Sequence, residues 1–134
     1  MKRFKLPNKA SLMSAWIMPH DIIDDIYDYW NNFETAKSKK VGTIGDDFYS
    51  PDIKDSNDLV IEPNNFDKPW DMYRHYLQEC LDDYLLQYPD ANKVESFNVR
   101  ENYGIQCYPK GGGYKVWHHE NNGGIYAHRH LVFM

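Results

Sequence analysis

His118 and Glu120 are the residues of this sequence whose types and spacing best suit metal chemistry. They stand in the stretch GGGYKVWHHENNGG, residues 111–124, between two glycine-rich turns. We expect residues 114–120 to form a strand, in which residues two apart project from one face with Cα atoms roughly 6–7 Å apart. One imidazole and one carboxylate are two of the three protein ligands in the facial triad that binds non-haem Fe(II). The third ligand, a second histidine, must then come from another strand.

His128 and His130 offer a competing set of ligands, because they are also two residues apart. From the next strand they would complete a three-histidine site with His118, or a cupin-like site with Glu120. Histidine-x-glutamate pairs also occur by chance. The metal-free alternative is a polar strand end for the first pair and ordinary surface histidines for the second.

Aromatic residues are frequent in this chain and include two that precede the metal-ligand pair. They make up 16% of 134 residues, and Tyr114 and Trp117 would flank a pocket at the pair. This composition is typical of a folded protein with a real core. The net charge of −5 and the scattered lysines and arginines argue against a nucleic-acid partner.

Two cysteines are too few for a disulfide framework, so we expect Cys80 and Cys107 to be reduced, buried thiols. No apolar run approaches the roughly 18 residues that a membrane span needs. The basic N-terminus also lacks the apolar run of a signal peptide. The sequence therefore predicts a cytoplasmic protein without a membrane partner.

Two amphipathic helices are expected before residue 95. Apolar residues recur at helical spacing between Ile22 and Phe33, which predicts a helix over about 21–37 with Asp21 as its cap. A second stripe runs from Trp70 to Leu85, with Asn64 or Asn65 as the cap, Pro69 in an early turn and Pro89 at the end; His75 lies off this stripe. We interpret the aromatic stripe as a core face.

The rest of the sequence mainly predicts strands. Residues 14–18 are expected to form a first strand, and residues 38–64 a long loop with a short strand at 59–61. From residue 96 the period changes to two, which predicts a strand or hairpin at 96–109 and further strands at 114–120 and from 125 to 134. Helices followed by closely spaced antiparallel strands indicate an α+β fold, with the helices packed on the strands.

The segment IQCYPKGGGYKVWHHEN, followed by HRHLVFM, resembles the first metal-binding strand region of the 2-oxoglutarate and Fe(II)-dependent dioxygenases. It is most similar to their prolyl-4-hydroxylase-like branch, found in phages and bacteria. The resemblance is specific over about residues 104–134. The matching positions are Tyr108, residues 111–113, Tyr114, Trp117, His118, Glu120, Arg129 and residues 131–134.

The resemblance implies a role for three residues. His118 and Glu120 match the first two iron ligands, although the family more often has aspartate in the second position. Tyr108 matches a tyrosine that lines the 2-oxoglutarate pocket. The family also needs a distal histidine and a lysine or arginine that pairs with the far carboxylate of 2-oxoglutarate, and both would lie beyond Met134.

The chain stops within the apolar run 131–134, so we expect an incomplete catalytic domain. In this interpretation one domain spans 1–134, with helical support over about 1–95 and the first strands of a jelly roll, or double-stranded β-helix, over about 96–134. The implied function is that of an oxidoreductase that uses Fe(II) and 2-oxoglutarate to hydroxylate a peptidyl proline, another peptidyl side chain or a small molecule. The alternatives are a non-catalytic phage or bacterial binding module and a cupin-like metal protein.

Overall fold

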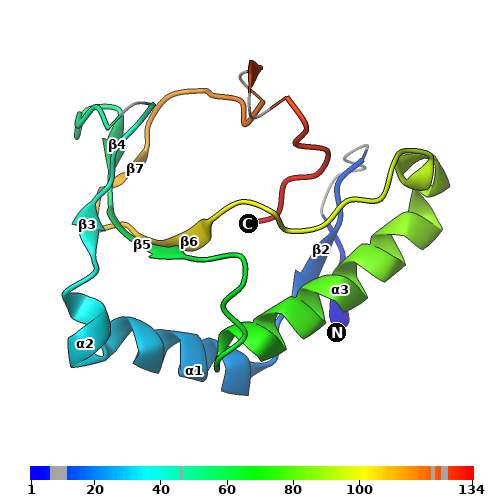
Figure 1. Ribbon diagram of the computed structural model, residues 1–134, viewed down its shortest axis with the longest axis horizontal. Helices are drawn as coiled ribbons and strands as arrows, with labels where there is room; N and C mark the ends of the chain where they lie inside the picture. The colour runs from blue at the N-terminus through cyan, green and yellow to red at the C-terminus, as the bar shows by residue number, and fades with distance from the viewer. Residues whose placement is uncertain (7–11, 46, 122, 125–126) are drawn as a thin grey trace. The chain divides into compact units, whose positions relative to one another are not determined.

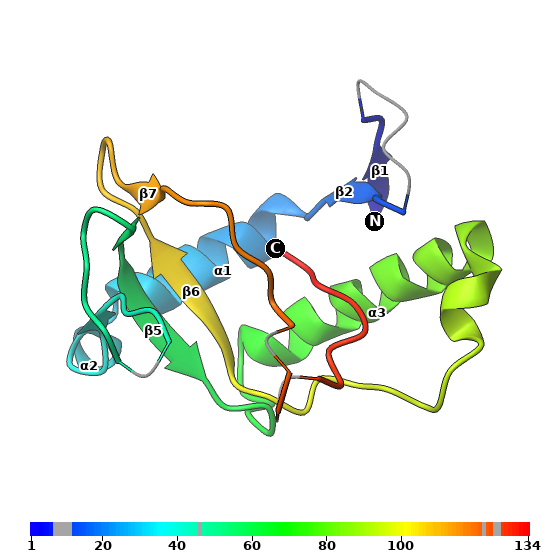
Figure 2. The ribbon, with the colours of Figure 1, turned by 90° about the horizontal axis from the view of Figure 1, so that it is seen from above.

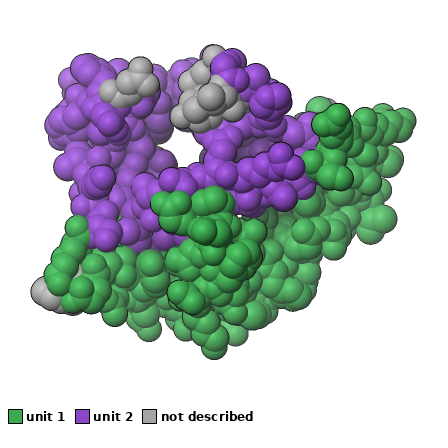
Figure 3. Space-filling view, in the orientation of Figure 1, with its two compact units in different colours: residues 1–37, 62–96 green, residues 38–61, 97–134 purple. Residues whose placement is uncertain are grey.

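The computed structural model combines helices with small antiparallel sheets (Figures 1 and 2). It describes residues 1–6, 12–45, 47–121, 123–124 and 127–134, with the side chain of Phe33 left out. The predicted α+β class is confirmed. The chain divides into two compact units, one of residues 1–37 and 62–96, the other of residues 38–61 and 97–134 (Figure 3). A single domain that spans the chain stays a prediction.

The first predicted helix is in place but interrupted. Helix α1 (His20–Asn31) begins after Pro19, with Asp21 in its first turn rather than at its cap. Asn32 is extended, and its side chain accepts a hydrogen bond from the backbone N–H of Glu34, 2.9 Å away, at the start of α2 (Phe33–Ala36). Asparagine competes in this way with the helical backbone. The continuous helix predicted over 21–37 is therefore wrong at this one residue.

Helix α3 (Trp70–Gln87) follows the second predicted stripe. Trp70 is buried, and its ring meets Tyr29 edge-on at a centroid distance of 5.1 Å and Tyr73 at 6.2 Å. Such aromatic pairs add to the burial of the rings themselves. The predicted asparagine cap is wrong, because Pro69 stands at the N-cap and Asn65 instead accepts a hydrogen bond from the N–H of Asp67.

An N-terminal hairpin completes the first unit. Strands β1 (Lys2–Phe4) and β2 (Ala15–Ile17) pair antiparallel, which confirms the predicted strand at 14–18 and adds one that the sequence pattern missed. Polar contacts tie this hairpin to α3. The Trp16 indole N–H donates to Asp83 over 2.8 Å, and the Met1 amine pairs with Glu79 over 2.8 Å. A short helix, η1 (Pro89–Asn92), follows α3.

The second unit holds two small sheets. Strand β5 (Asn57–Ile61) lies between β3 (Lys40–Val41) and β6 (Tyr103–Cys107), and β4 (Lys54–Asp55) pairs with β7 (Gly113–Tyr114); all these pairs are antiparallel. Along β5, Leu59 and Ile61 are buried while Val60 is exposed, the alternation of a half-buried strand. The strand predicted at 59–61 is confirmed as part of β5, and the loop predicted over the rest of 38–64 is wrong in part, since it also contains β3 and β4.

Two predicted strand regions are shorter in the structure, and the described residues of a third form no strand. Residues 97–102 form no strand, and only β6 remains of the region predicted over 96–109. The strand predicted over 114–120 retains only Tyr114, in β7, and residues 127–134 form none; residues 125–126 lie outside the described part of the chain. A strand needs a hydrogen-bonded neighbour, and alternation in the sequence cannot show whether one is present.

A buried charged cluster holds β4 against β5. The ammonium group of Lys54, a residue only 5% exposed, lies 2.5 Å from a carboxylate oxygen of Asp58. The buried Ser56 hydroxyl donates to the other oxygen of that carboxylate over 2.7 Å. Each of these buried polar groups therefore has a partner, as burial demands.

Two further features concern the burial of the cysteines and the length and apolar character of the helices. Cys80 and Cys107 are both free, but only Cys80 is half-buried; Cys107 is exposed, so its predicted burial is wrong. Among the described residues, none of the helices combines the length and the apolar character that crossing a bilayer requires.

Gly104 provides a test of the β5–β6 pairing. A Cβ atom at this position would collide with the backbone carbonyl of Leu59, which a side-chain rotation cannot relieve. Gly104→Ala should therefore lower the free energy of unfolding by about 1–3 kcal/mol. Urea denaturation measures it, with Cys107→Ala on the same strand as the control; equal stability of the two variants would contradict the close approach.

The buried Lys54 provides a second test. Asp58→Ala leaves its ammonium group without a carboxylate and should lower the free energy of unfolding by about 3 kcal/mol. The double variant Lys54→Met/Asp58→Ala should recover part of this loss, because the uncompensated charge is gone. Asp90→Ala is the control, because its ion pair with Lys93 is exposed and should contribute less than about 1 kcal/mol. A loss at Asp58 no larger than at Asp90 would show that the buried pair contributes nothing.

Candidate metal centre

The predicted metal ligands lie in a segment that is anchored at its beginning. Strand β7 pairs with β4 through Tyr114 and Gly113, and the N–H of Lys115 donates to the carbonyl of Ile53 over 2.7 Å. After Tyr114 the segment is no longer a strand. Local contacts, rather than strand alternation, therefore decide where His118 and Glu120 point.

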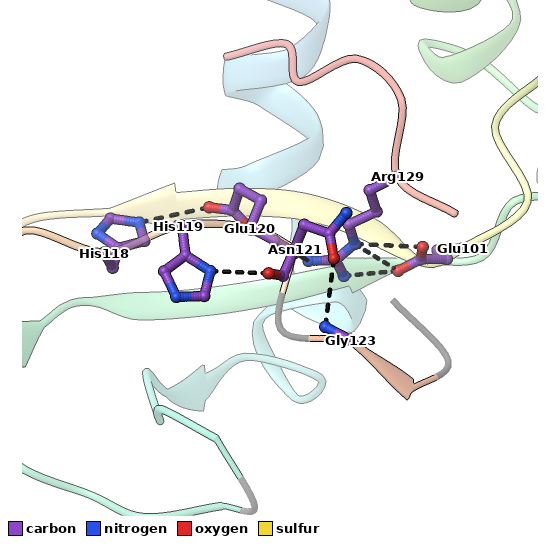
Figure 4. A network of polar contacts seen from close by, with 7 residues as sticks. All are labelled: Glu101, His118, His119, Glu120, Asn121, Gly123 and Arg129. Atoms are coloured by element: carbon purple, nitrogen blue, oxygen red, sulfur yellow. Dashed lines mark hydrogen bonds and ion pairs between the residues drawn. The ribbon is translucent and has the colours of Figure 1, made fainter. Parts of the chain in front are cut away.

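His118 and Glu120 nevertheless converge. Nε2 of His118 lies 3.3 Å from Oε1 of Glu120, and Figure 4 shows the two side chains turned toward each other. The other ring nitrogen of His118, Nδ1, lies 3.3 Å from the carbonyl oxygen of Val116. A carbonyl can only accept, so Nδ1 carries the proton in this contact. A neutral ring with its proton on Nδ1 would have a lone pair on Nε2, whereas a ring with a proton on Nε2 would donate it to Oε1 of Glu120.

Tyr114 fixes the plane of the His118 ring. The two rings stack with their centroids 3.8 Å apart and their planes 17° apart. Together with the Nδ1 contact, this stacking restricts both rotation and tilt of the imidazole. A histidine held by its outer nitrogen in this way is typical of metal ligands.

The separation of the two ligand atoms suits a shared metal ion. With metal–ligand bonds of about 2.0–2.1 Å, two ligands of one tetrahedral ion lie about 3.3 Å apart. The same distance also suits a direct ion pair, provided that the imidazole is protonated. Across the described ranges, no three histidine, cysteine, aspartate or glutamate side chains form a group that could hold a metal ion. The structure thus brings two ligands together and does not bring a third.

The second oxygen of Glu120 is bound by Arg129. Nη1 of Arg129 donates to Oε2 of Glu120 over 3.1 Å and to the backbone carbonyl of the same residue over 2.7 Å. The guanidinium group also binds Glu101 through Nε and Nη2, with a shortest distance of 2.6 Å (Figure 4). Because of the hydrogen bonds from Arg129, the pKa of Glu101 lies below its ordinary value.

Asn121 holds the turn that returns the chain from Glu120 to Arg129. Its side-chain oxygen accepts from the N–H of Gly123 over 3.2 Å, and its amide group donates to the carbonyl of Ala127 over 3.3 Å. Asparagine is suited to such a turn because its side chain imitates a backbone peptide. The chain is thereby folded back so that a residue nine positions later reaches the carboxylate.

An open cavity of about 510 Å³ lies against the ligand pair. His118, His119 and Glu120 line it, with an apolar wall that includes Tyr114 and Trp117 as well as Val132. Trp117 is fully exposed. The cavity wall contains no lysine or arginine among the residues that the structure describes.

The remaining histidines do not join the pair. Nδ1 of His119 lies 2.8 Å from the carbonyl oxygen of Asn121. His128 is exposed, and the ring of His130 meets Phe97 edge-on at 5.1 Å. His118, His128 and His130 are all described and form no group suited to a metal ion, so the structure does not bring together the three histidines of the alternative site.

Tyr108 lies just after β6 and is not among the residues that line the cavity. Its hydroxyl donates to Oε1 of Gln106 over 2.7 Å. Partial burial raises its pKa, which the charge of Lys54 partly offsets. The role toward 2-oxoglutarate that the resemblance implies for Tyr108 stays a prediction.

Glu101 is the residue of this network that the sequence analysis missed, and Arg129 is matched there without a role. Glu101 lies 28 residues before Arg129, in a segment predicted as part of a strand or hairpin. A lone glutamate in a polar stretch carries no signal of such a long-range partner. The arginine beside two histidines was the only available indication.

The sequence matches no protein-family model, and no curated protein or solved structure matches it significantly.

The Glu101–Arg129 pair predicts a pH dependence of stability. A carboxylate whose pKa is lowered by folding stabilises the fold above its unfolded pKa, near 4.5, and this contribution is lost as the pH falls through the folded value. Glu101→Gln should therefore be less stable than the parent chain at pH 7, and the difference should shrink as the pH falls below about 4.5. Thermal unfolding between pH 3 and pH 7 measures it; a difference that grows in acid would contradict the ion pair.

Proposed function

We propose that this chain is a catalytic part of an Fe(II)- and 2-oxoglutarate-dependent dioxygenase, in which His118 and Glu120 hold the iron. The observation that carries the proposal is the 3.3 Å approach of Nε2 of His118 to Oε1 of Glu120. The two side chains come this close although residues 115–120 do not form the predicted strand. Two donors of the types found in the facial triad therefore meet through local contacts alone.

The surroundings of His118 fit a metal ligand. Tyr114 stacks on the ring, and a proton on Nδ1 would donate to the Val116 carbonyl, a tautomer that would leave Nε2 as the donor atom for a metal ion. The chemistry that Fe(II) supplies in such sites is the activation of O₂ at open coordination positions. The open cavity beside the pair has an apolar wall that includes Tyr114 and Val132, against which the apolar part of a substrate would lie.

The described residues do not fit the second cofactor as well. The cavity wall offers no lysine or arginine for the far carboxylate of 2-oxoglutarate, and Arg129 already binds two glutamates. The proposed co-substrate, 2-oxoglutarate, and the proposed hydroxylation of a peptide or small molecule therefore rest on the sequence resemblance alone. We propose in the same way that the antiparallel sheets of the second unit belong to a jelly roll.

A metal-free binding module is the alternative function. Both oxygens of Glu120 have partners within the protein, His118 on one side and Arg129 on the other. In this alternative the network is an ion-pair cluster that holds Glu120 to Arg129 and Glu101. It predicts that no metal binds.

Anaerobic Fe(II) with 2-oxoglutarate separates the two functions. We expect a weak visible charge-transfer band in the folded protein, because the keto acid chelates the iron. His118→Ala should abolish the band, whereas His75→Ala should keep it, since His75 is an exposed histidine on α3 that pairs with Glu79. A folded protein that binds Fe(II) without a band would retain the metal site and lose the 2-oxoglutarate assignment; a protein that binds no metal would be the binding module.

A further inference from the structure

One face of the N-terminal hairpin points toward α3, and the other is open. Trp16 of β2 lies on the first face, because its indole N–H donates to Asp83 over 2.8 Å. Successive residues of a strand point to opposite faces, so Ile17 lies on the second face. Lys2 stands opposite Ile17 in the β1–β2 ladder, and Phe4, two residues later, shares this face. All three side chains are exposed, and we call them the open hairpin face.

Helix α1 also has an open face. Ile23 and Tyr27 lie four residues apart and are therefore neighbours on the helix surface, and Asp24 and Asp28 form a second row beside them. Tyr27 is 66% exposed, and the other three side chains are exposed as well. On the core side of the helix, by contrast, Ile22 is buried. The open α1 face, residues 23, 24, 27 and 28, thus presents an apolar row with an acidic row beside it.

The two open faces are complementary in charge. Lys2 accompanies the apolar residues of the hairpin and Lys5 follows just after β1, whereas Asp24 and Asp28 accompany the apolar row of α1. Among the ion pairs that the described residues form, none involves these four side chains. Exposed apolar side chains with polar residues at their rim are typical of a protein–protein contact. A basic rim on one face and an acidic rim on the other favour contact between two copies of the same chain.

We propose that the open hairpin face of one chain docks on the open α1 face of a second copy, so that two chains form a reciprocal dimer. Because every copy carries both faces, a two-fold arrangement makes the contact twice. The apolar side chains of the two faces pack together, and Lys2 and Lys5 of one copy meet Asp24 and Asp28 of the other. Both faces belong to the first unit and include no residue of the candidate metal centre, so the dimer goes beyond the proposed function.

Sedimentation equilibrium of the full chain tests the proposal. Few apolar side chains lie at each contact, so we expect a weak dimer with a Kd on the order of 100 µM. Added salt should weaken it, because salt screens exposed charges. Asp24→Lys/Asp28→Lys should raise the Kd at least about tenfold, since lysines then face lysines, and Lys2→Glu/Lys5→Glu should do the same with carboxylates.

A mixture of the two charge-reversed variants gives the sharpest test. Neither variant should dimerise alone where the parent chain does, but an equimolar mixture should form a heterodimer, because each reversed face then meets the opposite charge. Asp82→Lys/Asp90→Lys is the matched control. It makes the same change in net charge at exposed residues of the first unit outside both faces, so it should dimerise like the parent chain.

Tyr27→Ala tests the apolar part of the contact. Large aromatic side chains contribute most at the centre of an interface, so this variant should raise the Kd about tenfold. Leu86→Ala is its control, because Leu86 is an exposed apolar residue of α3 that belongs to neither face, and the Kd should stay unchanged.

Three results would overturn the proposal. They are a parent chain that is monomeric up to concentrations about tenfold above the expected Kd, a dimer that both charge reversals leave intact, and a mixture of the reversed variants that does not associate. Circular dichroism checks that each variant is folded. If one charge-reversed variant is not folded, the other variant and Tyr27→Ala decide, since a dimer that neither of them weakens does not use these faces.

Discussion

The requirement that a charge withdrawn from water be compensated organises the second unit. Lys54 lies almost wholly inside it, and the carboxylate of Asp58 and the hydroxyl of Ser56 complete a cluster in which each polar group has a partner. Lys54 also stands opposite Tyr114 in the β4–β7 ladder, and Tyr114 stacks on His118. The orientation of the candidate ligand thus depends, through two steps, on a buried ion pair.

The same requirement operates around Glu120. Its carboxylate is half-exposed and meets an imidazole and a guanidinium, and the guanidinium in turn is balanced by Glu101. A network of this kind can hold a loop that no sheet supports. The proposed metal-binding role of Glu120 is compatible with this structural role, since a well-held ligand is a better ligand.

The first unit relies on other forces. Trp70 packs edge-on between Tyr29 and Tyr73, and polar groups at the end of the N-terminal hairpin reach along α3 to Glu79 and Asp83. Small units bury limited apolar surface, so such anchoring contacts matter more than they would in a large core. Most residues of the α3 stripe are only half-buried, which agrees with this view.

The sequence by itself determined the elements whose signals are local. Helical spacing placed α3 and most of α1, and the short apolar run at 14–18 placed β2, because periodicity reports which face of one segment avoids water. The residue types and spacing of His118 and Glu120 also predicted the pair. The alternating pattern wrongly predicted a strand over residues 115–120, since a strand exists only where another segment offers hydrogen-bonding partners. Only the tertiary structure decided that Val116 and Tyr114 orient His118 and that Glu101, from 28 residues earlier in the chain, anchors Arg129. Such contacts join groups that are distant in sequence, and no local pattern encodes the meeting of an arginine with one particular glutamate.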